Sequence, residues 1–131
     1  LEAAKDAYKS TYGYEWQGDS LLIARETLLY TFIEYYRLKF GKDPLDKSIN
    51  YIAYIISWNL WQMDGLRCVV PGTCGQQKTI NTRLGDQTIE QPCDGCRTGD
   101  ISKHNGVYCL IRDWRKKTRE QQIESFVKTV K

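Results

Sequence analysis

A pair of closely spaced cysteines is the clearest sign of site chemistry in the sequence. Cys93 and Cys96 enclose an Asp-Gly dipeptide, and this spacing lets two thiolates bind one zinc ion from a tight turn. A second half-site must complete four-coordinate zinc, and Cys74, Cys109 and His104 are available for it. The ligand set that we predict is Cys74, Cys93, Cys96 and Cys109.

Two other interpretations of these cysteines stay open. The thiols could be free, or the closely spaced pair could be redox-active, although it follows no strand-into-helix unit. A structural zinc ion would supply the stability that this region, poor in apolar side chains, cannot obtain by burial. His104 stands beside Asn105-Gly106 and is favoured as a turn residue rather than a ligand, and Cys68 as a small core residue.

Two carboxylates could form a nucleoside-binding site. After a short predicted helix over Ala3–Lys9, the β-favouring segment Ser10–Glu15 ends at Glu15, and a second short strand, Asn59–Asp64, ends at Asp64. Ligands of open α/β sheets bind beyond the carboxyl ends of parallel strands. One carboxylate there can accept hydrogen bonds from two ribose hydroxyls, and another can accept one from an adenine amino group. The alternative is that both acids are only helix caps or surface residues.

Two helices are predicted between these acidic segments. Apolar residues at helical spacing predict a helix of about twenty residues, capped at Asp19 or Ser20 and ending before Gly41. Pro44 interrupts the chain, and Asp46 can cap the next helix. The predicted apolar faces consist of Leu21, Leu22, Leu28, Leu29, Phe32 and Tyr36 in the first helix, and Ile49, Ile52, Ala53 and Ile56 in the second.

The middle of the chain is expected to be rich in β-structure. Lys78–Leu84 and Gln87–Gln91 alternate in polarity and predict two strands around a turn at Gly85-Asp86. Val107–Trp114 is the clearest predicted strand in the chain.

Composition divides the chain into three segments. Residues 1–66 are rich in helix formers and aromatic side chains, and residues 67–114 contain all five cysteines. Residues 115–131 form a short charged tail, in which helical spacing of apolar residues predicts an amphipathic helix over Arg119–Val130. The total of 131 residues fits one domain.

The charge of the chain permits contact with nucleic acid without indicating it. Nineteen basic and 16 acidic residues give a net charge of +3. Basic residues are most concentrated near the C-terminus, and the candidates for nucleic-acid binding are Arg112, Arg115 and Lys116. A solvated helix start or loop explains this cluster equally well. The apolar runs are too short to cross a membrane.

Three stretches in the first half of the chain carry a family resemblance: Tyr12-Gly-Tyr-Glu15, the helix Asp19–Phe32, and Ile55–Leu66 with its Asn-x-x-x-x-Asp-Gly-Leu pattern. Together they resemble the central region of adenine-specific (N6) DNA methyltransferases. The likeness is strongest to the large methylase subunits and fused enzymes of bacterial restriction–modification systems. It implies an α/β fold, part of a Rossmann-like sheet that binds S-adenosylmethionine, with a cysteine-containing β-rich insertion.

The resemblance also implies roles for individual residues. Glu15 matches the acid that binds the cofactor's ribose, and Trp16 matches a position that packs on the adenine ring. Asp64 matches the acid that contacts the adenine amino group, and Leu66 flanks the ring.

Two motifs of the family are missing from the sequence. No glycine-rich loop precedes Ser10, and no Asn-Pro-Pro-Tyr catalytic loop is present, so no catalytic residue is assigned. We therefore expect a fragment or excised domain that does not methylate DNA alone. The alternative function is a non-enzymatic zinc-containing module that binds nucleic acid or protein.

Partners and compartment follow from these expectations. An odd number of cysteines without a signal peptide favours a reducing cytoplasm. The expected partners are DNA, bound through a parent enzyme, and the rest of that methyltransferase. Numerous aromatic residues could cover a surface that faces the parent enzyme, so a homodimer is expected in isolation.

Overall fold

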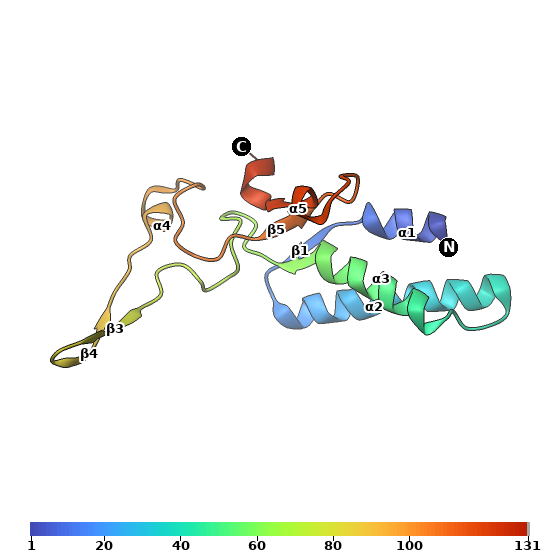
Figure 1. Ribbon diagram of the computed structural model, residues 1–131, viewed down its shortest axis with the longest axis horizontal. Coiled ribbons are helices and arrows are strands. Elements are labelled where there is room, and N and C mark those ends of the chain that lie inside the picture. Colours follow the sequence, from blue (N-terminus) through green and yellow to red (C-terminus); the bar gives the residue numbers. More distant parts are fainter. Residues whose placement is uncertain (131) are drawn as a thin grey trace. The chain divides into compact units, whose positions relative to one another are not determined.

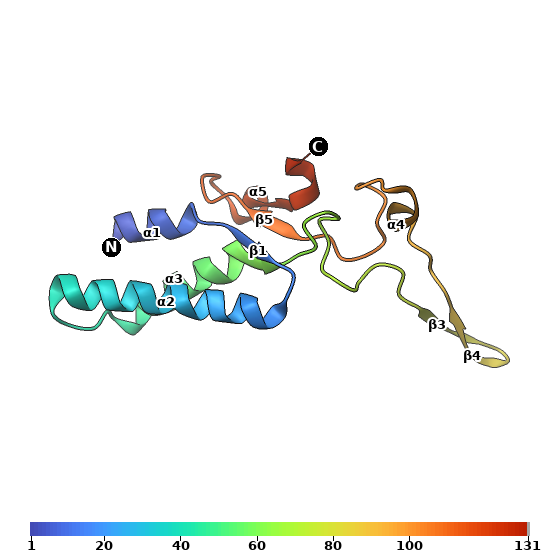
Figure 2. The ribbon, with the colours of Figure 1, turned by 180° about the vertical axis from the view of Figure 1, so that it is seen from behind.

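The computed structural model describes residues 1–130, which divide into two units (Figure 1 and Figure 2). Residues 1–62 and 111–124 form the first unit, and residues 63–110 with those after 124 form the second. The fold is mixed α/β, and the described residues form three sheets of two strands each. The predicted segments end at residues 66 and 114, whereas the chain passes between the units after residues 62, 110 and 124.

Three helices, α1 (Glu2–Lys9), α2 (Gly18–Phe40) and α3 (Asp46–Asn59), build the first unit. The sequence predicts all three. α2 begins slightly earlier than expected, after an N-cap at Gln17, and ends at Gly41. The φ of Gly41 is 66°, a left-handed conformation that glycine adopts without steric cost. Within residues 1–130 no helix combines the length and apolarity needed to cross a bilayer.

The facing apolar sides of α2 and α3 form the core of the first unit. Its buried members are Leu21, Phe32, Ile52, Ile55, Ile56 and Leu60. Tyr8 of α1 sets its ring edge-on against Phe32 and donates a hydrogen bond to the Leu28 carbonyl. Leu60, the residue after α3, belongs to this core and therefore fixes where the following strand begins.

Two short strands of the first unit, β1 (Gly13–Glu15) and β2 (Leu60–Gln62), pair in parallel. Because α2 and α3 connect them, this is the strand–helix–helix–strand order that the sequence predicts. Glu15 pairs with Gln62 at the carboxyl ends of the two strands. The sheet has only these two strands among the described residues, so a larger Rossmann-like sheet stays a prediction.

The buried amide of Asn59 joins distant parts of the first unit. Its Nδ2 donates to the carbonyls of Tyr8 and Lys9, at 2.9 and 3.2 Å. Its Oδ1 accepts a 2.9 Å hydrogen bond from the Trp114 indole. These bonds satisfy a fully buried polar side chain and attach residues 111–124 to the helices.

The C-terminal segment differs from the prediction of one helix. It contains α5 (Arg119–Gln122), strand β6 (Ile123–Ser125) and the 3₁₀ helix η1 (Phe126–Thr129). β6 pairs with β5 (Leu110–Arg112). The helix prediction over Arg119–Val130 is wrong because pairing with a neighbouring strand satisfies backbone groups in the middle of that segment, and tertiary pairing outweighs local propensity.

The second unit contains a hairpin and one short helix. The hairpin consists of β3 (Lys78–Thr82) and β4 (Gly85–Ile89), and α4 (Asp94–Thr98) follows it. The two predicted strands are confirmed. Their turn lies at Arg83-Leu84, two residues before the predicted position.

The second unit also has a small core, to which the hairpin does not contribute. Cys68, Val69 and Cys109 are at most 2% exposed. Val69 forms an antiparallel bridge with Tyr108, and the Cys109 N–H donates to the Cys68 carbonyl at 3.0 Å. The predicted strand Val107–Trp114 is therefore regular only at this bridge and in β5.

Candidate metal centre

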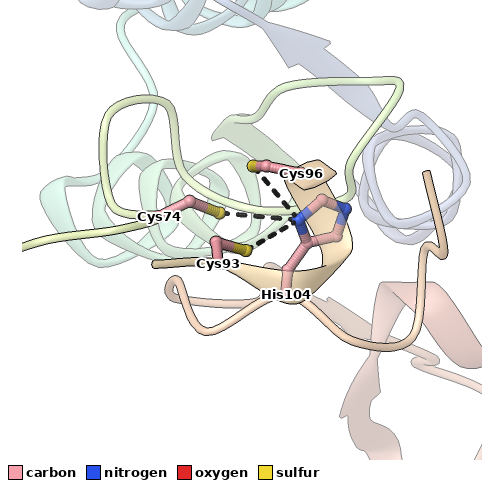
Figure 3. Close-up of side chains that lie close together, drawn as sticks. All are labelled: Cys74, Cys93, Cys96 and His104. Carbon is pink, nitrogen blue, oxygen red and sulfur yellow. Dashed lines mark hydrogen bonds between the residues drawn. The ribbon is translucent and has the colours of Figure 1, made fainter. Parts of the chain in front are cut away.

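Four side chains of the second unit converge on one point (Figure 3). They belong to Cys74, Cys93, Cys96 and His104, and their ligand atoms all lie within 4.8 Å of one another. The Sγ atoms of the three cysteines lie 3.6, 3.4 and 3.6 Å from Nδ1 of the histidine. Three thiols and one imidazole at this spacing can hold a metal ion.

The short helix α4 positions two of these ligands. Cys93 is its N-cap and Cys96 lies in the helix, so both side chains project from a single turn. The Gly95 N–H donates to the Lys103 carbonyl at 3.0 Å, which draws the following histidine against the helix. The Asn105 N–H donates to the Cys93 sulfur at 3.4 Å. Donors of this kind stabilise a negatively charged sulfur.

Two glycines allow the loops to approach so closely. A Cβ atom on Gly95 would stand 2.7 Å from the imidazole and backbone nitrogen of His104. A Cβ atom on Gly106 would stand 2.8 Å from the Cys74 sulfur and 2.6 Å from the Thr73 hydroxyl. Since real Cβ atoms do not come this near, both positions require glycine.

Tyr108 helps to fix the position of His104. Its hydroxyl accepts a 2.8 Å hydrogen bond from the His104 backbone N–H and donates one of 2.9 Å to the Ile101 carbonyl. The two rings also meet edge to face, with centroids 6.4 Å apart. The position of the histidine is therefore fixed by its surroundings as well as by the cysteines.

Two thiols of the cluster, those of Cys93 and Cys74, have pKa values shifted in opposite directions. Desolvation opposes ionisation of Cys93, but hydrogen bonds from the N–H groups of Cys96 and Asn105, and from His104, outweigh it and lower its pKa to about 6. Desolvation, followed by the hydrogen bonds with the other two thiols, raises the pKa of Cys74 to about 11. Without a cation, one thiolate therefore disfavours ionisation of the next, and a divalent metal ion would relieve this.

The structure replaces one of the four predicted ligands. Cys109 is fully buried beside Cys68, away from the cluster, and burial raises its pKa to about 11. His104 takes its place, contrary to the expectation of a turn residue. The signal in the sequence is that His104 is the only histidine, lies in the cysteine-rich segment and is followed by Asn105 and then Gly106, a residue that closely approaching loops need.

Comparison with known proteins adds no relatives. No protein-family model, curated protein or solved structure matches the chain. The geometry of the site therefore carries the functional argument.

The two cofactor-binding candidates of the first unit lie at the end of β1. Glu15 is exposed, and one of its carboxylate oxygens accepts a 3.2 Å hydrogen bond from the Gln17 N–H. The indole of Trp16 is 54% exposed, and its backbone carbonyl accepts a hydrogen bond from the side chain of Gln62. Both side chains are thus open to a ligand.

The other two candidates belong to the second unit. Asp64 is buried, accepts a 3.0 Å hydrogen bond from the Leu66 N–H, and forms an ion pair with Arg67 at 3.6 Å. Leu66 is 90% exposed. The Asp64 N–H donates to the Val69 carbonyl, so its carboxylate is held in a defined turn.

The three candidates for nucleic-acid binding differ in exposure. Arg115 and Lys116 are exposed, and Arg115 forms an ion pair with Asp113 at 2.9 Å. Arg112 is only 7% exposed. Its guanidinium lies 4.1 Å from the ring centroid of Trp114 and donates to Gln122 Oε1 at 2.7 Å, so it is engaged inside the first unit instead of facing solvent.

Proposed function

We propose that the chain is part of an adenine-specific (N6) DNA methyltransferase, with a structural zinc ion in its second unit. The observation that carries the first part is the parallel pairing of β1 and β2 around two connecting helices, with Glu15 at the carboxyl end. This is the place where open α/β sheets bind their ligands. The proposal extends this pair to a Rossmann-like sheet completed by the rest of the enzyme.

The residues at the end of β1 fit S-adenosylmethionine. Glu15 is exposed and uses one carboxylate oxygen to accept from the Gln17 N–H, so its other oxygen can accept hydrogen bonds from ribose hydroxyls, while Trp16 offers an exposed ring for adenine. The resemblance implies Asp64 and Leu66 for the adenine, but both belong to the second unit, so the site proposed in the first unit consists of Glu15 and Trp16. The cofactor would supply an electrophilic methyl group. Because the sequence has no Asn-Pro-Pro-Tyr motif, the role proposed for this chain is cofactor binding and not methyl transfer.

Calorimetric titration with S-adenosylmethionine tests this proposal. We expect saturable binding that weakens at least about tenfold in Glu15→Gln, because this variant loses a charged hydrogen-bond acceptor. Glu34→Gln, an exposed acid on α2, is the matched control and leaves the affinity unchanged. If the unsubstituted chain shows no binding, or if the two variants behave alike, the assignment of Glu15 is wrong.

The second part of the proposal is that zinc is the ion held by the cysteines and histidine. Zinc lies about 2.3 Å from thiolate sulfur and about 2.0 Å from imidazole nitrogen, so a tetrahedral arrangement separates these two atom types by about 3.5 Å. The distances of 3.4 to 3.6 Å between the sulfurs and Nδ1 agree with this value. A complete set of four protein ligands is typical of structural zinc and leaves no position for a substrate.

A zinc-containing binding module without enzymatic activity is the second candidate function, and the same four-ligand geometry favours it. It predicts one zinc per chain and no binding of S-adenosylmethionine. DNA binding would then weaken with salt and on replacing Arg115 and Lys116 by alanine. Metal analysis of the purified protein measures the zinc content independently of either function. Free thiols at such a site need a reducing compartment, which supports a cytoplasmic location.

A further inference from the structure

The side chains of the β3–β4 hairpin are exposed to solvent instead of packed in a core. Every residue from Lys78 to Ile89 is exposed except Thr82, which is half-buried. In Figure 1 the hairpin projects away from α4, the other regular element close to it in sequence. An isolated two-stranded hairpin is only marginally stable in water, so it needs support from its base.

The candidate metal ligands lie at the base of this hairpin. Cys74 lies four residues before β3 and Cys93 four residues after β4, so one metal ion would join both ends. Asn105 joins the same two ends directly. Its Oδ1 accepts from the Gly75 N–H at 2.9 Å, and its Nδ2 donates to the Gln91 carbonyl at 3.2 Å. Asn105 thus holds together the base of a hairpin that buries almost nothing itself, and a bound metal ion would add a second connection there.

The two faces of the hairpin differ in charge. Paired residues project to the same face, and one face carries the pairs Lys78 with Ile89, Ile80 with Gln87, and Thr82 with Gly85 beside the turn. We call the first four of these residues the reading face. The opposite face carries the pairs Thr79 with Thr88 and Asn81 with Asp86. The reading face therefore has a lysine and no acid, whereas the opposite face has an acid and no base.

We infer that the reading face binds in the major groove of duplex DNA. A two-stranded β-ribbon fits the width of this groove. Gln87 can bind an adenine edge, Ile80 and Ile89 can contact thymine methyl groups, and Lys78 can contact phosphate. Asp86 is held on the side away from the DNA. Because this supplies a DNA-contacting surface, it rests on the proposed function and deepens it.

Fluorescence anisotropy with the zinc-loaded full chain tests the inference. One probe is a labelled duplex of random sequence, and the other is a duplex selected by the chain from a randomised library. We expect Gln87→Ala to weaken binding to the selected duplex roughly 5- to 100-fold and binding to the random duplex little. Lys78→Ala should weaken both and reduce the salt slope by about one. Thr88→Ala, on the opposite face, is the control.

The outcomes are distinct from those of the cofactor titration. Loss of binding after zinc removal, together with sensitivity to Gln87 but not Thr88, supports the inference. DNA binding that is equally sensitive to both faces, or a library without an enriched sequence, overturns it. So does the absence of DNA binding by the zinc-loaded chain, in which case the free edges of the hairpin suit a protein strand instead. Unchanged zinc content in each variant shows that the metal site at the base of the hairpin is still folded.

Discussion

Gly95 and His104 approach so closely that a single methyl group between them would stand 2.7 Å from the imidazole. We therefore expect Gly95→Ala to weaken zinc binding at least about tenfold, because the histidine must move out of the cluster. Competition with a zinc-binding dye measures the affinity. Gly65→Ala is the matched control, since nothing lies within 4 Å of a Cβ atom at that position of the same unit. Equal affinities in the two variants would falsify the close contact.

Replacing single ligands distinguishes the Cys₃His set from the four-cysteine set. We expect His104→Ala to lose stoichiometric zinc and Cys109→Ala to keep one zinc per chain, because the Cys109 side chain lies in the small apolar core. Cys109→Ala should instead lower the unfolding free energy by about 1 kcal/mol through the cavity it leaves. Metal analysis and urea unfolding measure the two effects. The reverse pattern would restore the set expected from the sequence.

Zinc affinity should fall as the pH is lowered, and more steeply below about pH 6. In the metal-free protein at neutral pH, Cys93, with a pKa of about 6, is mostly thiolate, whereas Cys74, with a pKa of about 11, is protonated. Binding at pH 7 therefore releases the Cys74 proton, and below about pH 6 it must release the Cys93 proton as well. Titrations in buffers of different ionisation enthalpy count these protons. A pH-independent affinity would contradict the assignment.

Arg112 should contribute to stability instead of DNA binding. Its guanidinium is surrounded by the rings of Tyr54, Trp58 and Trp114, at 5.3, 5.2 and 4.1 Å from their centroids. We expect Arg112→Lys to lower the unfolding free energy by about 2 kcal/mol, because the compact ammonium cannot stack on these rings in the same way. Arg115→Lys, at an exposed position, should change stability little. Urea unfolding of both variants shows whether the substitution at buried Arg112 lowers the unfolding free energy more than the one at exposed Arg115.

The local fold of the first unit could be predicted because its signals are local. The stop at Gly41 and the break at Pro44 bound α2 and the loop after it, and the apolar spacing identifies the faces that pack. Glu15 ends β1, as the strand pattern predicts, whereas β2 ends at Gln62 and Asp64 lies beyond it. The use of these acids by a cofactor is a chemical hypothesis that the backbone alone does not decide.

The remaining errors come from contacts between distant residues. The helix expected over Arg119–Val130 is interrupted because the middle of this segment pairs with β5. No local sequence pattern indicates this pairing. The hairpin turns at Arg83-Leu84 because the Thr82 hydroxyl bonds to both the Leu84 N–H and the Gly85 carbonyl. The sequence favours a turn residue at His104 because Asn105-Gly106 follows it. The same turn places the His104 side chain against the cysteines.

The clamp made by Asn105 has a consequence for the chemical ageing of the protein. Asparagine followed by glycine deamidates readily, and Asn105 is exposed. Conversion to aspartate would replace the Nδ2 donor with an anionic oxygen facing the carbonyls of Gln91 and Pro92, at the 3.2 and 3.4 Å now spanned by hydrogen bonds. Stored samples should therefore accumulate a more acidic form with a loosened hairpin, which mass spectrometry combined with limited proteolysis would reveal as faster cleavage in that form.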